Sequence, residues 1–195
     1  MNDKGGRSGD LRDPVSRRRV LVFALGAGLG LGGAGCADLM SSAQGFRTLT
    51  LDGAVFDASD YLGKNALLIT FWRVGCSPCL QQMPVFSQLQ RAYAERGLVV
   101  IAISIDGPAS RGQVRARAID SGVDFPVLLD DDSTVFNRYA PHHDMPLTVI
   151  VNRDGSVRRR FAGVYFTGPG GELAEEIEAA LADPSPAPDP RGEQR

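Results

Sequence analysis

The sequence predicts an α/β fold in which helices cover both faces of a central mixed sheet. Three observations support this class: strand-like apolar runs alternate with helical patterns, the runs 66–72 and 98–105 are apolar almost throughout, and the Asp154–Gly155 pair separates two further strand patterns. With 43% hydrophobic and 23% charged residues among 195, the composition is that of a globular protein. Three cysteines are too few for a scaffold held together by disulfides.

Strands are expected where short apolar or alternating runs occur. They cover 48–51, 66–72, 98–105, 126–129, 147–151 and 156–163. Helices are expected where apolar residues recur every three or four positions, over about 77–95, 111–120, 133–139 and a last stretch marked by Leu173, Ile177 and Leu181. Pro84 should kink the first of these helices, and Asp132 or Ser133 should cap the third.

The first 35 residues have the pattern of an export signal. The segment beginning Ser16-Arg17-Arg18 resembles a twin-arginine signal. It precedes an apolar stretch, rich in glycine and alanine, that is too short to span a bilayer as a helix. Gly33-Ala34-Gly35-Cys36 resembles the lipobox of bacterial lipoproteins, which implies an acylated Cys36. The alternatives are a cleaved signal with an incidental cysteine and an uncleaved anchor.

The remaining chain divides into a tether, a domain and a tail. Residues 36–45 form the tether, 46–181 the folded domain, and 182–195, rich in proline, a disordered tail. The formal charge follows this division. It is −2 overall, but the first 35 residues hold six basic and three acidic side chains, so the rest carries −5. Such an acidic body argues against a protein that binds nucleic acid through phosphate contacts.

The candidate chemistry lies at Cys76-Ser77-Pro78-Cys79, between a buried strand and an amphipathic helix. The free N–H groups and the dipole at a helix N-terminus favour an anion, so the Cys76 thiolate should be stabilised and its pKa lowered. Cys79, one turn further on, should be shielded by the helix. An exposed nucleophile beside a shielded resolving thiol is the arrangement that thiol–disulfide exchange requires. Pro78 restricts the loop between them.

At this point the sequence resembles a known family. The segment 71–84 (FWRVGCSPCLQQMP) looks like the active site of thioredoxin-fold proteins, and it is most similar to the membrane-anchored TlpA/ResA-type thiol–disulfide oxidoreductases. The segments 98–106 and 145–155 (MPLTVIVNRDG) look like that family's strand after the active-site helix and its Pro-x-Thr strand with an Asp-Gly hairpin. The resemblance covers about 46–181 and implies a thioredoxin-like fold.

The resemblance also implies how a substrate is bound. By position, Pro146 should be the cis-proline that faces the cysteine pair, and Met145 before it should offer backbone hydrogen bonds to a bound peptide. The Met145 thioether either contacts substrate as well or merely covers the cysteines. Trp72, at the end of the buried strand, is expected to contribute to the same substrate-binding surface.

Several residues around the pair are expected to tune it. Gly75 replaces a bulky residue common in the family, which leaves the thiol more open. Gln82 and Thr70 stand where relatives carry carboxylates, so the pair should lack nearby acids, and proton transfer to Cys79 would rely on water or Thr70. Arg73 either adds a positive field or is a solvated loop residue.

The resemblance favours a reductant that acts on exported protein thiols and disulfides and is fed by a membrane thiol protein that donates electrons. No cofactor is implied. The predicted location is the cell envelope, with the protein held at a membrane surface by lipid on Cys36.

Other uses of the cysteines remain open. The pair could form a structural disulfide, or half of a zinc site completed by Cys36, His142 or His143. His142 or His143 with the pair and Met145 would suit Cu(I). A thiol peroxidase is a further alternative, since residues 103–106 resemble redoxins.

Two charged runs receive plainer interpretations. Asp130-Asp131-Asp132 should end a strand and cap the next helix, with calcium binding as the alternative. Arg158-Arg159-Arg160 should lie mostly solvated on a hairpin strand, where it is also placed to face an acidic membrane or partner.

Overall fold

The computed structural model describes residues 43, 45–165 and 167–182. They form a seven-stranded sheet of order β2-β1-β5-β4-β3-β6-β7. The strands are β1 (Arg47–Thr50), β2 (Val55–Asp57), β3 (Ala66–Trp72), β4 (Leu98–Ser104), β5 (Val127–Leu129), β6 (Leu147–Val151) and β7 (Val157–Ala162). The α-helices are α2 (Ser77–Tyr93), α3 (Arg111–Asp120), α4 (Thr134–Tyr139) and α5 (Glu172–Ala182). Strands β3, β4 and β5 run parallel, whereas β6 is antiparallel to β3, so the sheet is mixed.

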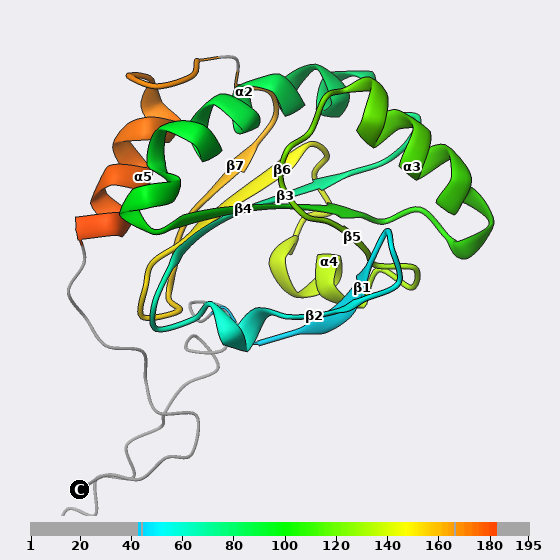
Figure 1. Ribbon diagram of the computed structural model, residues 1–195, viewed down its shortest axis with the longest axis horizontal. Coiled ribbons are helices and arrows are strands. Elements are labelled where there is room, and N and C mark those ends of the chain that lie inside the picture. The colour runs from blue at the N-terminus through cyan, green and yellow to red at the C-terminus, as the bar shows by residue number, and fades with distance from the viewer. Residues whose placement is uncertain (1–42, 44, 166, 183–195) are drawn as a thin grey trace, which may run out of the picture. The chain divides into compact units, whose positions relative to one another are not determined.

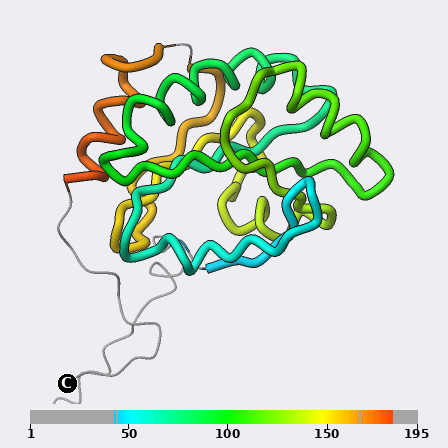
Figure 2. The backbone as a smooth tube through the Cα atoms, viewed as in Figure 1, coloured from blue at the N-terminus to red at the C-terminus, as the bar shows by residue number. Residues whose placement is uncertain are grey.

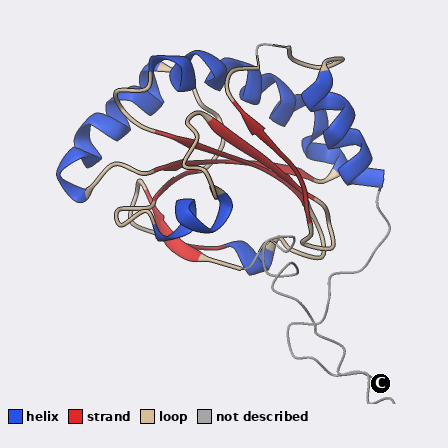
Figure 3. Ribbon diagram, turned by 180° about the vertical axis from the view of Figure 1, so that it is seen from behind, coloured by secondary structure: helices blue, strands red, loops and turns tan. Residues whose placement is uncertain are grey.

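The helices cover both faces of the sheet, as the element order predicts. Helices α2, α3 and α5 lie on one face and α4 on the other (Figure 1), and the view from behind shows the same division (Figure 3). The chain passes from β3 through α2 to β4, and from β4 through α3 to β5 (Figure 2). These crossovers are what parallel neighbours require.

Strand β3 lies in the middle of the core because its seven side chains are all buried. Successive side chains of a strand point to opposite faces. Leu68 and Trp72 therefore pack in the cluster under α2, α3 and α5, whereas Ile69 and Phe71 pack in the cluster with α4. A continuous apolar run is the sequence pattern that such a doubly covered strand needs.

The sequence missed β2. This strand forms a hairpin with β1, in which Thr48 faces Phe56, and the connecting turn holds Gly53 at φ 82°. Asp52–Gly53 is the same dipeptide that marked the Asp154–Gly155 hairpin, so the signal was present. The exposed Val55 and the short length of β2 made the strand pattern itself weak.

Two helices show how the residues singled out by the sequence are used, Pro84 within α2 and the acidic run at the start of α4. Helix α2 runs through Pro84 as one continuous element, with this residue exposed. Ser133 is the N-cap residue of α4, but its side chain makes no capping hydrogen bond, and Asp132 accepts the Thr134 N–H at 3.0 Å instead. Asp130 makes the buried contacts, since its two carboxylate oxygens accept the N–H groups of Val135 and Phe136 at 3.1 and 2.7 Å.

The predicted export signal (1–35), the predicted lipidation site Cys36 and most of the predicted tether and tail lie outside the described residues. No helix within the described part of the chain is both long and apolar enough to span a membrane.

Candidate functional site

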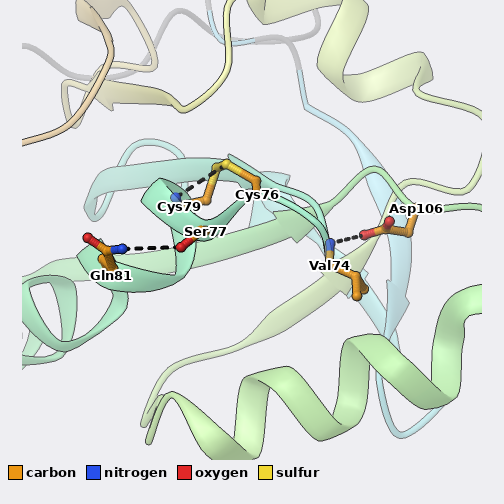
Figure 4. The surroundings of a disulfide bond; sticks show 6 residues. All are labelled: Val74, Cys76, Ser77, Cys79, Gln81 and Asp106. Carbon is orange, nitrogen blue, oxygen red and sulfur yellow. Dashed lines mark hydrogen bonds between the residues drawn. A yellow bond between two sulfur atoms is a disulfide. The ribbon is translucent and has the colours of Figure 1, made fainter.

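The two cysteines lie where β3 passes into α2. Cys76 is the N-cap residue of α2 and forms a disulfide with Cys79 in the first turn (Figure 4). The pair therefore stands at the carboxyl end of the central strand, at the N-terminus of a helix of 17 residues. The strand–helix junction predicted from the sequence is the one observed.

The two sulfur atoms differ in their access to solvent. Cys76 is partly exposed, whereas Cys79 is 1% exposed and belongs to the core cluster under α2. The Cys79 N–H donates to the Cys76 Sγ at 3.3 Å, and the first turn of α2 contains no acidic residue. When the disulfide is reduced, the same N–H and the helix dipole favour a thiolate at Cys76. At the start of α2, the reduced pair therefore consists of an accessible thiol at Cys76 and a shielded thiol at Cys79.

Strand β6 brings a second loop to the same end of the sheet. Leu147 pairs with Phe71, so Met145 and Pro146 come level with the end of β3. The Met145–Pro146 bond is cis, and the Pro146 carbonyl accepts the Gly163 N–H at 2.9 Å. The half-buried Met145 packs against the cluster that also receives Cys76. The cis bond expected from the family resemblance is therefore present beside the redox pair.

Trp72 does not reach the surface. It is 1% exposed, lies in the core cluster under α2, and its indole Nε1 has no hydrogen-bond partner. This placement differs from the expected contact with substrate, because the period-two alternation of β3 directs Trp72 inward. Thr70 is also buried in β3, opposite Thr148 of β6.

The other residues expected to tune the site have distinct environments. Gln82 is completely buried in α2; its Nε2 donates to the Tyr165 carbonyl at 3.4 Å, while its Oε1 has no partner. Arg73 and Pro78 are exposed, Arg73 in the loop before the pair and Pro78 in the first turn of α2. Arg73 forms no ion pair with a carboxylate of the described residues. It stands three residues before Cys76, where a peroxidatic site needs threonine.

Positions 70 and 82 hold no acid, as expected, but sequence reasoning missed a carboxylate that contacts the loop before the pair. Asp106, two residues past the end of β4, accepts the Val74 N–H at 2.9 Å (Figure 4). Thr70 and Gln82 stand where relatives carry acids, in β3 and α2. Asp106 instead follows a different strand, β4. Its position directly after a buried parallel strand was the available signal.

Neither the acidic run 130–132 nor the two histidines belong to a cluster of metal-binding side chains within the described part of the chain. Among the described residues, no three His, Cys, Asp or Glu side chains gather at metal-binding distances. Asp131 pairs with Arg111, and His142 and His143 are exposed.

The arginine run lies on β7 with Arg158 and Arg159 exposed, as expected, and it also contacts α5 and α4. Arg158 and Arg159 form ion pairs with glutamates of α5, and the Arg160 Nε donates to the Tyr139 carbonyl at 3.0 Å.

Comparisons with known proteins agree with this geometry. The sequence pattern of the AhpC/TSA family matches residues 40–160. The thioredoxin-like protein YneN of Bacillus subtilis is 39% identical over 88 residues, which is 45% of this chain and 51% of YneN. The thiol-disulfide oxidoreductase ResA of Bacillus subtilis is 28% identical over 123 residues, or 63% of this chain and 66% of ResA. The chain thus spans about half of YneN and about two thirds of ResA.

A solved structure supports the same assignment. A Chlorobium tepidum protein described as a thiol:disulfide interchange protein DsbE superposes with a TM-score of 0.65 at 27% identity, covering 72% of this chain and 96% of that one. The family match, the relatives and the strand–helix position of the cysteines agree. The chain belongs to the AhpC/TSA family, and its domain is a thioredoxin-like thiol–disulfide oxidoreductase of the TlpA/ResA type.

Proposed function

We propose that this protein exchanges disulfides with exported proteins through Cys76 and Cys79, and that it acts as their reductant. The observation that carries the proposal is the unequal exposure of the two sulfur atoms at a helix N-terminus: Cys76 is accessible and Cys79 is 1% exposed. A purely structural disulfide has no need of one accessible sulfur beside a cis-proline loop.

The exchange proceeds in two displacements. The Cys76 thiolate attacks one sulfur of the partner disulfide, which forms a mixed disulfide and releases the first partner thiolate, and that thiolate takes up a proton. Cys79 then loses its proton and attacks the Cys76 Sγ, which closes the intramolecular disulfide and releases the second partner thiolate. Two electrons pass from the pair to the partner.

Substrate binding is proposed for the loop that carries the cis-proline. Met145 is half-buried and stands level with the end of β3, where it can present its backbone to an extended peptide. Pro146 is buried and shapes this loop without exposing its own side chain. The peptide would cross the end of the sheet beside Cys76.

Export and anchoring are proposed from the sequence of the first 36 residues. A lipid on Cys36 would hold the domain at a membrane surface of the cell envelope, within reach of a membrane thiol protein that re-reduces the pair. Mass spectrometry of the mature N-terminus tests this part: acylated Cys36 is expected, and a mature N-terminus beyond residue 36 contradicts it.

Trapping tests the exchange. In Cys79→Ser the second displacement is blocked, so mixed disulfides through Cys76 should accumulate in the native membrane and identify the partners by mass spectrometry. The matched control is the double variant Cys76→Ser/Cys79→Ser, which should trap none. Equal trapping by both proteins would overturn the proposed exchange.

The direction of electron flow needs a second measurement. Equilibration of the pair with glutathione gives its reduction potential, for which a value near that of thioredoxin, about −270 mV, fits a reductant. A value near that of a strong oxidant such as DsbA, about −120 mV, excludes the reductant role.

A further inference from the structure

The connection between β3 and α2 is held at its middle by a side chain of another strand. Four residues, 73–76, link the two elements. The Val74 N–H donates to Asp106 Oδ2 at 2.9 Å. The register of the parallel strands explains this contact: Trp72 faces Ser104, so two residues further on Val74 faces Asp106. A carboxylate thus takes the place of a ladder acceptor just beyond the end of the sheet.

Asp106 is itself held by its own strand. The Ser104 Oγ, which is fully buried, donates to the same Oδ2 at 2.8 Å and accepts the Asp106 N–H at 3.3 Å. The Ile105 N–H donates to the Trp72 carbonyl at 3.1 Å and continues the β3–β4 ladder up to the carboxylate. Asp106 is therefore attached to the central sheet on one side and to the loop on the other.

The contact leads to Cys76 through one peptide group. The Val74 N–H and the Arg73 carbonyl belong to the same planar unit. That carbonyl accepts the Cys76 N–H at 3.0 Å. A carboxylate on the N–H of a peptide group polarises it and strengthens its carbonyl as an acceptor. Asp106 and the Cys76 amide are thereby joined in a chain of two hydrogen bonds.

We propose that Asp106 is a positioning residue for the redox pair, which acts on Cys76 through the Arg73–Val74 peptide group and makes the pair more reducing. The inference rests on the proposed function of the same two cysteines. It assigns a role to Asp106, which follows β4 and is remote in sequence from the cysteine motif.

Two consequences follow from this chain. The carboxylate fixes the peptide plane that delivers Cys76 to the N-cap position, so the accessible sulfur keeps one orientation. It also commits the Cys76 N–H to the Arg73 carbonyl and brings a negative charge to the loop, and both effects disfavour a thiolate at Cys76. A less stable reduced form means a stronger reductant.

The test compares two isosteric variants. Asp106→Asn keeps an oxygen acceptor for Val74 and Ser104 but removes the charge. Asp154→Asn is the matched control, because Asp154 likewise accepts a backbone N–H and a serine hydroxyl, both from Ser156, in the β6–β7 hairpin at the other end of the sheet. Each oxidised protein is equilibrated with glutathione, in which two glutathione thiols reduce the pair and form one glutathione disulfide.

In Asp106→Asn we expect the equilibrium constant for reduction to rise about tenfold, which corresponds to about 30 mV for a two-electron couple. The pH at which half of Cys76 is alkylated should fall. Asp154→Asn should change neither quantity. If Asp106 had only a structural role, Asp106→Asn would lower the midpoint of thermal unfolding but would change neither the equilibrium constant for reduction nor the pH of half-alkylation.

A second variant covers the case in which Asp106→Asn does not fold. Ser104→Ala keeps the charge and removes the hydroxyl that holds it, so the equilibrium constant should shift in the same direction by a smaller factor. The proposal is wrong if the folded variants equilibrate as the wild type does. If the wild-type pair fails to equilibrate with glutathione at all, the proposed function itself is wrong, so the two failures are distinguishable.

Discussion

Arg159 and Glu176 join the edge strand β7 to helix α5, with 2.8 Å between the guanidinium and carboxylate. Arg158 donates to the other oxygen of Glu176 at 2.6 Å, and Arg159 also pairs with Glu172. The Arg159 guanidinium lies over the Phe161 ring at 4.8 Å. A carboxylate that receives two arginines is the centre of this network, so its charge state should affect how firmly α5 covers the sheet.

Replacing Glu176 by glutamine should lower the free energy of unfolding by about 0.5–1 kcal/mol at neutral pH, the upper part of the range for surface pairs. The hydrogen bond from Arg159, followed by that from Arg158, lowers the pKa of Glu176 below its usual 4.5. The stabilisation is therefore present above pH 4.5 and disappears as the pH falls through the lowered pKa. Urea unfolding at several pH values measures it.

The control for this change is Glu175→Gln, since Glu175 is exposed on the same helix and takes part in none of the ion pairs that the described residues form. It should leave the unfolding curve unchanged. Equal losses in the two variants would argue against the network.

Tyr139 should remain protonated well above the pH at which an ordinary tyrosine ionises. It is 3% exposed and packs between Phe46 and Phe71, and burial raises its pKa to about 12. Unfolded tyrosine titrates near pH 10, so the folded protein should lose up to about 2–3 kcal/mol of stability as the pH rises from 10 to 12. Absorbance at 295 nm follows the ionisation.

Tyr139→Phe keeps the buried ring and removes the hydroxyl. The last step of the absorbance titration should vanish in this variant, and its stability should fall less steeply between pH 10 and 12. A titration curve identical to that of the wild type would show that another tyrosine carries the late step.

Asp130→Ala should destabilise the domain by about 1–3 kcal/mol, because two buried N–H groups at the start of α4 would lose their acceptor. Asp132→Ala, at the exposed cap of the same helix, should cost less, since water can replace its carboxylate. Urea denaturation of the two variants makes the comparison. The interpretation fails if the Asp132 variant proves the less stable.

Gln82→Met should raise the free energy of unfolding by about 1 kcal/mol, because it replaces a fully buried amide whose Oε1 has no partner by an apolar chain of similar length. If Gln82 tunes the redox pair, the same variant should exchange with glutathione more slowly. Gln88→Met, at an exposed position of α2, is the control and should change neither property. A loss of stability in the Gln82 variant would indicate that its 3.4 Å bond to Tyr165 is the larger effect.

Much of the fold could be predicted from local patterns. The strands β3 and β6 and helix α3 begin and end where the sequence placed them, since long apolar runs and regular periodicity are strong signals. The cysteine pair was located for the same reason, at a junction between two such elements. The short β2 was missed because three residues provide little periodicity.

The side chains around the pair could not be assigned in the same way. Trp72 was expected at the substrate surface and lies in the core, because the alternation of β3 and the position of α2 decide which way it points. Arg158 and Arg159 are exposed as expected, but their ion pairs were not predicted, since only the packing of α5 against β7 brings Glu172 and Glu176 to them.

By itself, the sequence determined the class of fold and the position of Cys76 and Cys79 between a strand and a helix, and the proposal of an anchor at Cys36 rests on the sequence alone. These depend on patterns within a few consecutive residues. Only the tertiary structure decided that Asp106 holds the loop before Cys76, since the contact spans 32 positions and exists because β3 and β4 pair in one register. Contacts between residues distant in the chain depend on register and helix placement, which local periodicity does not encode.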